Sequence, residues 1–218
     1  MKGVYNLRPP QSRYQEIWDP ALVLQFLKTL APAKFLSLKD LTHKLATLMA
    51  LVSAQRAQTL HLLDTNAMTI SKHNVKFIIS TPLKQARPGI SNPTIVFKAY
   101  APDRRLCVVT YIREYLKRTQ HFRTQSSQFF LSYSRRHVPV VKSTISRWIK
   151  TTLHRAGVPD NFKAHSTRAA AATSAWHHSI PIEDILKQAG WSSSNTFARY
   201  YCKPPLRPDV ASTLLDRT

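Results

Sequence analysis

Apolar residues recur every three or four positions over long stretches of this 218-residue chain, a spacing typical of amphipathic helices. The pattern predicts a short apolar helix over 21–30 and a longer one over 38–53. The longer helix has a capping-box-like start, because Ser37 is followed three positions later by Asp40. One or two further helical turns are predicted over 54–64. These elements supply the first part of a helical core.

The second half of the chain carries the same helical spacing, with clear start and stop signals. A helix is predicted over 107–119, and another over 143–157 with Ser143 as its N-cap and Gly157 at its end. Three shorter helices follow in the C-terminal third, and they are predicted to begin after His165, at Pro181 and at Ser194.

One region changes from helical to strand periodicity. β-branched and aromatic residues dominate 75–80 and 94–100, and the segment 81–93 between them contains prolines and a glycine. We therefore predict a β-hairpin with a wide, basic tip. A weaker extended stretch is predicted over 128–133.

These elements predict one mainly α domain of the α+β class, a helical bundle with a small antiparallel β-sheet or hairpin. Residues 1–20, with their three prolines, predict an extended lead-in. The domain is expected to cover 21–205, and 206–218 form a C-terminal tail in which prolines break any further helix.

The charge of the chain is its most unusual property. Thirty-two Lys and Arg face eleven Asp and Glu, and the formal net charge of +21 attracts polyanions such as nucleic acid. No apolar run is long enough to span a bilayer, and the N-terminus lacks the apolar core of a signal peptide, so we expect an intracellular protein with no membrane partner. Cys107 and Cys202 lie far apart and predict neither a disulfide framework nor a zinc site.

Basic residues are concentrated between positions 101 and 163, where thirteen Lys and Arg accompany three acids. Singly, each is most simply a solvated surface residue, but as a group they favour a face for phosphates. Our candidates for DNA binding are Arg87 in the hairpin tip and Lys142, Arg147 and Lys150 on a predicted helix. Charge alone would suit an RNA-binding protein equally, although the chain has no RNA-recognition motif.

The segment HSTR places His165 and Arg168 three positions apart at the start of a predicted helix. This spacing puts both side chains on one face, next to backbone N–H groups that favour an anion. The alanines at 169–172 offer a smooth surface that a neighbouring helix can approach closely. A His and an Arg at this spacing are common by chance, so the pair indicates a site only together with other residues.

Four further residues complete a set, and they occur in a recognisable order: Arg56 in QRAQ, Lys84 in LKQARPG, Trp191 in AGW, and Tyr200 nine positions later. Together with the HSTR pair, this order resembles that of the tyrosine recombinases, the family of the phage integrases and the Xer and Cre proteins. The sequences of the segments SRYQEIWDP, QRAQTLHLLD and AGWSSSNTFARYY most resemble those of DIRS-like retrotransposon recombinases. The resemblance covers roughly residues 12–205 and implies the tyrosine-recombinase catalytic-domain fold.

The resemblance implies a tyrosine nucleophile, and the chain has two adjacent candidates, Tyr200 and Tyr201. Neighbouring residues of a helix point about 100° apart, so only one of them can face a bound phosphate. The interval from Trp191 selects Tyr200, which would attack the phosphorus and hold the 3′ end covalently. Tyr201 is expected to pack beside it.

The other motif residues would act on the same phosphate. Arg56 and Arg168 would clamp it, because guanidinium offers rigid paired donors that stay charged. His165 and the indole N–H of Trp191 would add hydrogen bonds, and His165 could also manage the tyrosine proton. Lys84 would protonate the leaving 5′ oxygen. The implied reaction is a DNA transesterification that needs no metal and no nucleotide cofactor.

Two positions depart from the pattern or leave it open. In a different hairpin register, Lys72, Lys76 or Arg87 would take the place expected for Lys84. Thr59, three positions after Arg56, stands where bacterial members often have an acid, which affects how Arg56 is braced.

Two functions agree with these residues. The first is an enzyme that cleaves and rejoins double-stranded DNA, and the second is a domesticated, catalytically silent DNA-binding protein. Family members usually add an N-terminal helical domain that clamps DNA, so we expect this chain to be either a fragment or a domain that binds DNA weakly. The resemblance also implies a homotetramer on paired DNA sites and no small-molecule substrate. Because the similar recombinases are those of eukaryotic retrotransposons, it further implies a nuclear location.

Overall fold

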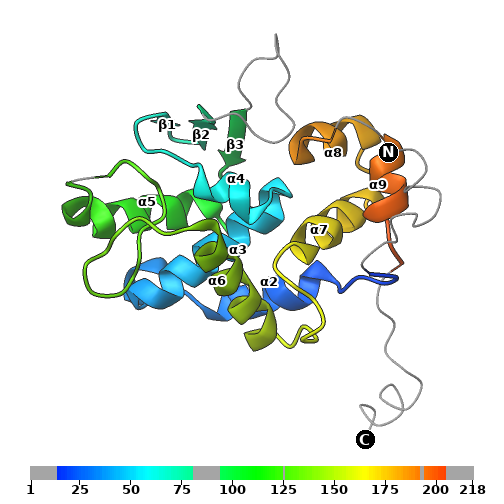
Figure 1. Cartoon of the computed structure of the whole chain (residues 1–218), viewed down its shortest axis with the longest axis horizontal. Helices are drawn as coiled ribbons and strands as arrows, with labels where there is room; N and C mark the ends of the chain where they lie inside the picture. The colour runs from blue at the N-terminus through cyan, green and yellow to red at the C-terminus, as the bar shows by residue number, and fades with distance from the viewer. Residues whose placement is uncertain (1–13, 81–93, 125, 192–193, 205–218) are drawn as a thin grey trace, which may run out of the picture.

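The computed structural model describes residues 14–80, 94–124, 126–191 and 194–204, without the side chains of residues 196, 199 and 200. The mainly helical α+β fold that the sequence predicts is confirmed (Figure 1). The described helices are α2 (Pro20–Thr29), α3 (Leu38–Ser53), α4 (Ala57–His61), α5 (Val108–Thr119), α6 (Lys142–Arg155), α7 (Ser166–His177), α8 (Ile182–Ala189) and α9 (Ser194–Tyr200). None of the described helices is long and apolar enough to cross a membrane.

Helix α3 forms the centre of the bundle. Every residue from Leu41 to Leu51 is buried, and the helix packs against α5, α6 and α7. The hydroxyl of Ser37 accepts a hydrogen bond from the backbone N–H of Asp40 at 3.0 Å, which confirms the predicted cap. α7, α8 and α9 lie on one side of the molecule, and α5 lies on the other (Figure 1).

The sheet has three antiparallel strands in the order β1 (Met68–Ile70), β2 (Asn74–Ile78) and β3 (Thr94–Lys98). The predicted pairing of β2 with β3 is confirmed, and Val75 and Phe97, which lie opposite each other, both face the core. The third strand, β1, was not predicted. The tip of the hairpin, 81–93, lies outside the described residues.

The prediction that Ser143 is the N-cap of the helix over 143–157 is wrong. Helix α6 begins at Lys142, its N-cap is Val141, and Ser143 lies within the first turn. Val141 has the extended conformation (φ −84°, ψ 161°) that precedes a helix, and its carbonyl accepts hydrogen bonds from Thr144 and Ile145. The chain therefore turns into the helix earlier than a serine cap would place it.

The extended segment before α2 packs onto the bundle. Ile17 and Trp18 are each only 2% exposed, and the Trp18 indole N–H donates to the hydroxyl of Ser166 at 2.8 Å. The backbone N–H of Ile17 donates to the carbonyl of Pro204 at 3.0 Å. These contacts tie the described N-terminal segment to α7 and to the segment that follows α9.

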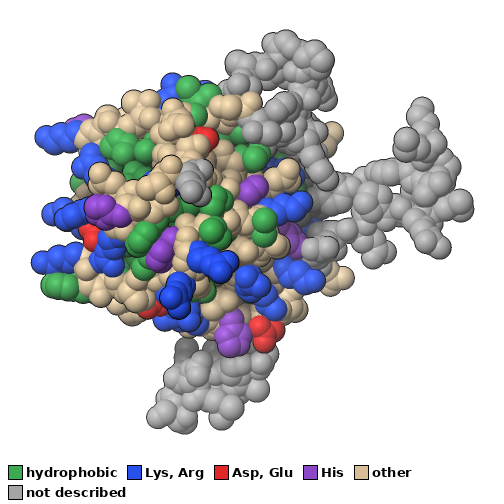
Figure 2. All heavy atoms as spheres, turned by 60° about the vertical axis from the view of Figure 1, so that its left-hand side comes forward, with side chains coloured by type: hydrophobic (Ala, Val, Ile, Leu, Met, Phe, Trp, Pro, Cys, Tyr) green, Lys and Arg blue, Asp and Glu red, His purple; other side chains and the backbone are tan. Residues whose placement is uncertain are grey.

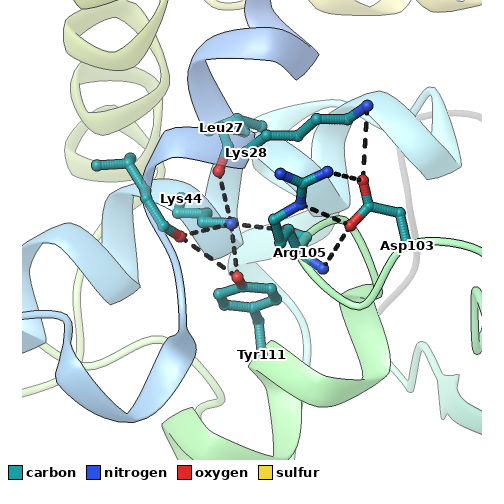
Figure 3. A network of polar contacts seen from close by, with 7 residues as sticks. Leu27, Lys28, Lys44, Asp103, Arg105 and Tyr111 are labelled. Carbon is teal, nitrogen blue, oxygen red and sulfur yellow. Dashed lines mark hydrogen bonds and ion pairs between the residues drawn. The ribbon is translucent and has the colours of Figure 1, made fainter.

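A buried lysine on α3 joins three segments of the chain (Figure 3). The Nζ atom of Lys44 lies 2.6–2.7 Å from four oxygens, which are the carbonyls of Leu27, Leu30 and Arg105 and the hydroxyl of Tyr111. Burial lowers the pKa of Lys44 to about 7, although the charge of Asp103 opposes the shift. The network gives a charged donor to carbonyls at the C-terminal end of α2, where the Leu27 carbonyl also accepts the backbone N–H of Leu30 at 3.2 Å.

A second buried titratable residue on α3, His43, makes stability depend on pH. Burial and then the charges of Lys39 and Arg155 lower the His43 pKa from 6.5 to about 4, with Asp40 opposing. Between these values the unfolded chain binds a proton that the folded chain does not. The stabilisation is therefore complete above about pH 6.5 and is lost as the pH falls towards 4.

We predict that His43→Phe reduces this acid sensitivity. Neither ring nitrogen of His43 has a hydrogen-bond partner among the described residues, so phenylalanine leaves no polar group unsatisfied. Wild type should lose up to about 3 kcal/mol more unfolding free energy than the variant between pH 7 and pH 4, measured by urea unfolding. His73→Phe, at an exposed turn, controls for the substitution itself. Equal losses in wild type and His43→Phe would contradict this account.

Candidate active site

The candidate site is built around the junction between α3 and α4. Ala54, which ends α3, is buried and has left-handed backbone angles (φ 49°, ψ 26°). This turn reverses the chain so that Arg56 becomes the N-cap of α4 with an extended backbone. A left-handed alanine is strained, and such strain persists only where surrounding contacts hold it.

Arg168 on α7 holds this junction. Its side chain is only 1% exposed, and its Nη1 donates to the carbonyl of Ala54 at 2.9 Å. The other guanidinium nitrogens, Nε and Nη2, are buried and have no hydrogen-bond partner among the described residues. A buried arginine normally has all of its donors paired, so these two nitrogens are available to an acceptor.

Trp191 covers the same guanidinium. The Cζ atom of Arg168 lies 4.1 Å from the Trp191 ring centroid and 5.5 Å from that of Tyr201. Trp191 directly follows Gly190, which ends α8 in a left-handed conformation (φ +66°). The backbone N–H of Trp191 donates to the Leu186 carbonyl at 2.9 Å. The indole Nε1 of Trp191 is also buried without a partner among the described residues.

The electrostatics of Arg168 indicate an anion site. Burial, and then the positive charge of Arg56, lower its pKa to about 10, while Tyr201 opposes the shift. Arg168 therefore remains charged at neutral pH, although it is buried beside a second arginine. Two guanidinium groups this close repel each other, and a bound anion would relieve both the repulsion and the unpaired donors.

His165 lies at the N-cap of α7 and is exposed, as its place at the start of the predicted helix implies. Its ring stacks on that of Tyr14, with centroids 5.4 Å apart. Arg56 and His165 line one cavity of about 360 Å³ together with Lys142 at the start of α6. The structure thus brings together three parts of the chain that are distant in sequence, namely Arg56, the pair His165 and Arg168, and Trp191.

Three predicted site residues are not placed at the level of side chains. Lys84 and Arg87 lie outside the described residues. Tyr200 is the last residue of α9, and its side chain is not described. The ring of its neighbour Tyr201 lies 4.4 Å from that of Trp191, measured between centroids. The catalytic roles of all six motif residues remain predictions.

The basic candidates on α6 are exposed. Lys142, Arg147 and Lys150 all lie on the solvent side of the helix, whereas Ile145, Trp148 and Ile149 face the core. Figure 2 shows many Lys and Arg side chains and few Asp and Glu on the face it presents. Lys142 lies next to the cavity of Arg56 and His165, and DNA binding by these basic residues stays a prediction.

Several contacts of the site have no signal in the sequence. Gln55 donates to the carbonyl of Gln188, 133 positions away, and Gln188 donates to the carbonyl of Val52, so two hydrogen bonds join the ends of α3 and α8. Tyr14 stacks on His165 from the segment expected to be a plain lead-in. Periodicity cannot show such pairs, because they join residues whose own helices or loops are otherwise unrelated.

A mainly helical domain with a small sheet, a paired-arginine site and a tyrosine-bearing C-terminal helix define the class of the tyrosine recombinases. The model of the phage integrase family matches residues 21–205. The chain therefore belongs to the phage integrase family, the tyrosine recombinases. No curated protein sequence matches the chain.

Solved structures share the fold at low sequence identity. XerH recombinase bound to its difH substrate in a pre-cleavage complex aligns with a TM-score of 0.65 at 13% identity, covering 87% of this chain and 50% of XerH. XerA recombinase aligns at 0.63 and 18% identity, covering 97% and 67%. A lambda integrase dimer bound to a COC′ core site aligns at 0.57 and 15% identity, covering 96% and 68%. The chain spans about half the length of XerH.

Proposed function

We propose that the chain cleaves and rejoins double-stranded DNA through a covalent 3′-phosphotyrosine intermediate, with Tyr200 as the nucleophile. The observation that carries the proposal is the environment of Arg168, a buried cation with two unpaired donor nitrogens beside a second arginine. Burying a charge without a partner is costly, so this arrangement fits a site completed by an anion. A phosphodiester supplies such an anion, and XerH was solved bound to its difH substrate and lambda integrase bound to a COC′ core site.

The proposed reaction assigns each group one task. The Tyr200 phenol gives its proton to His165 as its oxygen attacks the phosphorus, the bond from phosphorus to the 5′ oxygen breaks, and the departing oxygen takes a proton from Lys84. Arg56 and Arg168 donate to the non-bridging oxygens, where negative charge develops. Rejoining is the same sequence in reverse, with a 5′ hydroxyl as the attacking group. The phosphotyrosine bond conserves the energy of the broken bond.

His165 and Trp191 complete the donor set in this proposal. The Trp191 indole N–H is buried next to Arg168 and has no partner among the described residues, so it can donate to the same phosphate. His165 stands at the rim of the site, at the N-cap of α7, where the helix dipole favours an anion, although the first three backbone N–H groups of the helix already donate to backbone carbonyls.

The basic residues of α6 would bind the DNA backbone on either side of the cleaved bond. Lys142, Arg147 and Lys150 are exposed along one helix whose first turn borders the site. Arg87 would add a contact from the hairpin tip. Lambda integrase forms a tetramer on a Holliday junction, and we propose that this chain likewise acts as a homotetramer on paired sites.

A trapping assay tests the proposed reaction. The whole chain is incubated with a library of duplexes of randomised sequence, each nicked so that cleavage releases a short fragment and prevents rejoining. After denaturation, we expect DNA covalently attached to the protein, and peptide mapping should locate the bond at a tyrosine. Binding to the library without any covalent adduct would contradict strand cleavage and favour the catalytically silent DNA-binding protein.

Gly190→Ala is expected to slow formation of this adduct. A methyl group at Gly190 meets no atom closer than 3.9 Å, but the left-handed backbone (φ +66°) makes alanine strained by about 1–2 kcal/mol. Relief of that strain would move Trp191, the next residue. Gly157→Ala carries the same kind of strain (φ +87°) with open space around it, at the end of α6. Both variants should lose stability in thermal unfolding, and equal adduct rates in the two would contradict the role of Gly190.

A further inference from the structure

The C-terminal ends of α3 and α8 cap each other through two glutamines. The Nε2 of Gln55 donates to the backbone carbonyl of Gln188 at 2.7 Å, and the Nε2 of Gln188 donates to the carbonyl of Val52 at 3.1 Å. Both carbonyls belong to the last turn of a helix, where the helix itself supplies no donor. We call this pair of bonds the glutamine clamp.

The glutamine clamp lies between two residues of the candidate site. Gln55 directly precedes Arg56, and Gln188 lies three positions before Trp191. On the same junction, Arg168 donates to the carbonyl of Ala54 at 2.9 Å. The carbonyls of Val52 and Ala54 at the α3 terminus therefore accept from Gln188 of α8 and Arg168 of α7, and Gln55 donates in return to a carbonyl of α8.

Helix α8 meets the end of α3 through the glutamine clamp and through a buried apolar cluster in which Ile185 and Ala189 join Ala54. Its main packing partners among the described helices are α7 and α9, and Ile185 and Ala189 are its buried residues. Its other face borders a cavity of about 830 Å³, which is also lined by Gln55, Arg56 and residues of β3. With a cavity rather than packed side chains on that face, the direct hydrogen bonds to the α3 terminus are those of the glutamine clamp.

We propose that Gln55 and Gln188 are positioning residues that hold α8, and with it Trp191 and the start of α9, in register with Arg56 and Arg168. This inference rests on the proposed function. The clamp donates only to backbone carbonyls, so its contribution is geometric and does not involve the DNA. Its loss should therefore slow the covalent step without weakening DNA binding.

Gln55→Met and Gln188→Met test the proposal, because methionine keeps the length of the side chain and removes the donor. Each variant is expected to form the covalent adduct about two- to tenfold more slowly at saturating DNA, the effect of one lost hydrogen bond. The Kd for the same duplexes, measured by a gel-shift titration, should stay within about twofold of wild type. Gln25→Met on the exposed face of α2 is the matched control and should behave as wild type.

Hydrogen exchange tests whether the clamp holds the end of α8, and it does so independently of catalysis. The amides of Gly190 and Trp191 close the end of α8, and they should exchange about two- to tenfold faster in both clamp variants than in Gln25→Met. If the clamp variants match the control in exchange and in adduct rate, the clamp has no positioning role. If wild type forms no adduct, the proposed function fails, and the exchange experiment alone decides whether the clamp holds α8.

Discussion

Tyr200→Phe is expected to abolish the covalent protein–DNA adduct, whereas Tyr201→Phe should still form it. Phenylalanine has no oxygen to attack the phosphorus, so the loss should exceed about 10³-fold in the trapping assay. Tyr201 occupies a packing position: its ring lies 4.4 Å from the Trp191 ring, and its carbonyl accepts a hydrogen bond from Thr173 at 2.7 Å. Removing its hydroxyl leaves these two contacts in place and removes only its interaction with Arg168, so the adduct should still form, at a reduced rate at most.

The opposite result would move the nucleophile by one residue. An adduct that survives Tyr200→Phe and disappears in Tyr201→Phe would assign the attack to Tyr201, whose ring lies 5.5 Å from the Cζ atom of Arg168. Each variant should first be shown to unfold at the wild-type temperature. Peptide mapping of the wild-type adduct gives an independent answer, because it identifies the modified tyrosine directly.

Arg168→Met should separate activity from stability. We expect adduct formation to fall by about 10²–10³-fold or more, since the variant lacks the paired donors that meet the developing charge. The unfolding free energy should stay within about 1 kcal/mol of wild type. The variant leaves the carbonyl of Ala54 unpaired, but it also removes a buried charge with two unpartnered nitrogens.

Arg123→Met is the matched control for this prediction. Arg123 is also largely buried, but its donors are satisfied, with the carbonyls of Gln128 and Phe129 each at 2.6 Å. Its replacement should cost about 2 kcal/mol or more, because two carbonyls lose a charged donor. A large loss of stability in Arg168→Met, comparable with that of Arg123→Met, would show that Arg168 is retained for the fold rather than for a phosphate.

The helices were predictable where the sequence carries both periodicity and end signals. Ser37 before α3 and Pro181 and Gly190 around α8 mark their helices to within a residue. β1 gave no such signal, since it has three residues and none of them is buried. The N-cap prediction at Ser143 failed because an N-cap residue has an extended backbone, and the extended residue here is Val141.

The candidate site was predictable from the order of its chemical groups and not from their surroundings. Sequence order nominated Arg56, Arg168 and Trp191, which the structure brings together. It could not show that Arg168 is buried with unpaired donors, because burial depends on how α7 packs on the α3 terminus. The glutamine clamp could not be predicted for a similar reason: glutamines are common in and around helices, and only the tertiary structure brings these two together.

The Lys44 network has a consequence for how this chain can diverge. Three of its four acceptors are backbone carbonyls, contributed by Leu27, Leu30 and Arg105. Every amino acid supplies a carbonyl, so mutations at these three partner positions can accumulate without removing an acceptor. The constraint falls on Lys44 and on Tyr111, whose hydroxyl is the fourth acceptor, and related sequences could preserve the junction of α2, α3 and the 101–106 loop while differing at the three positions that contribute carbonyls.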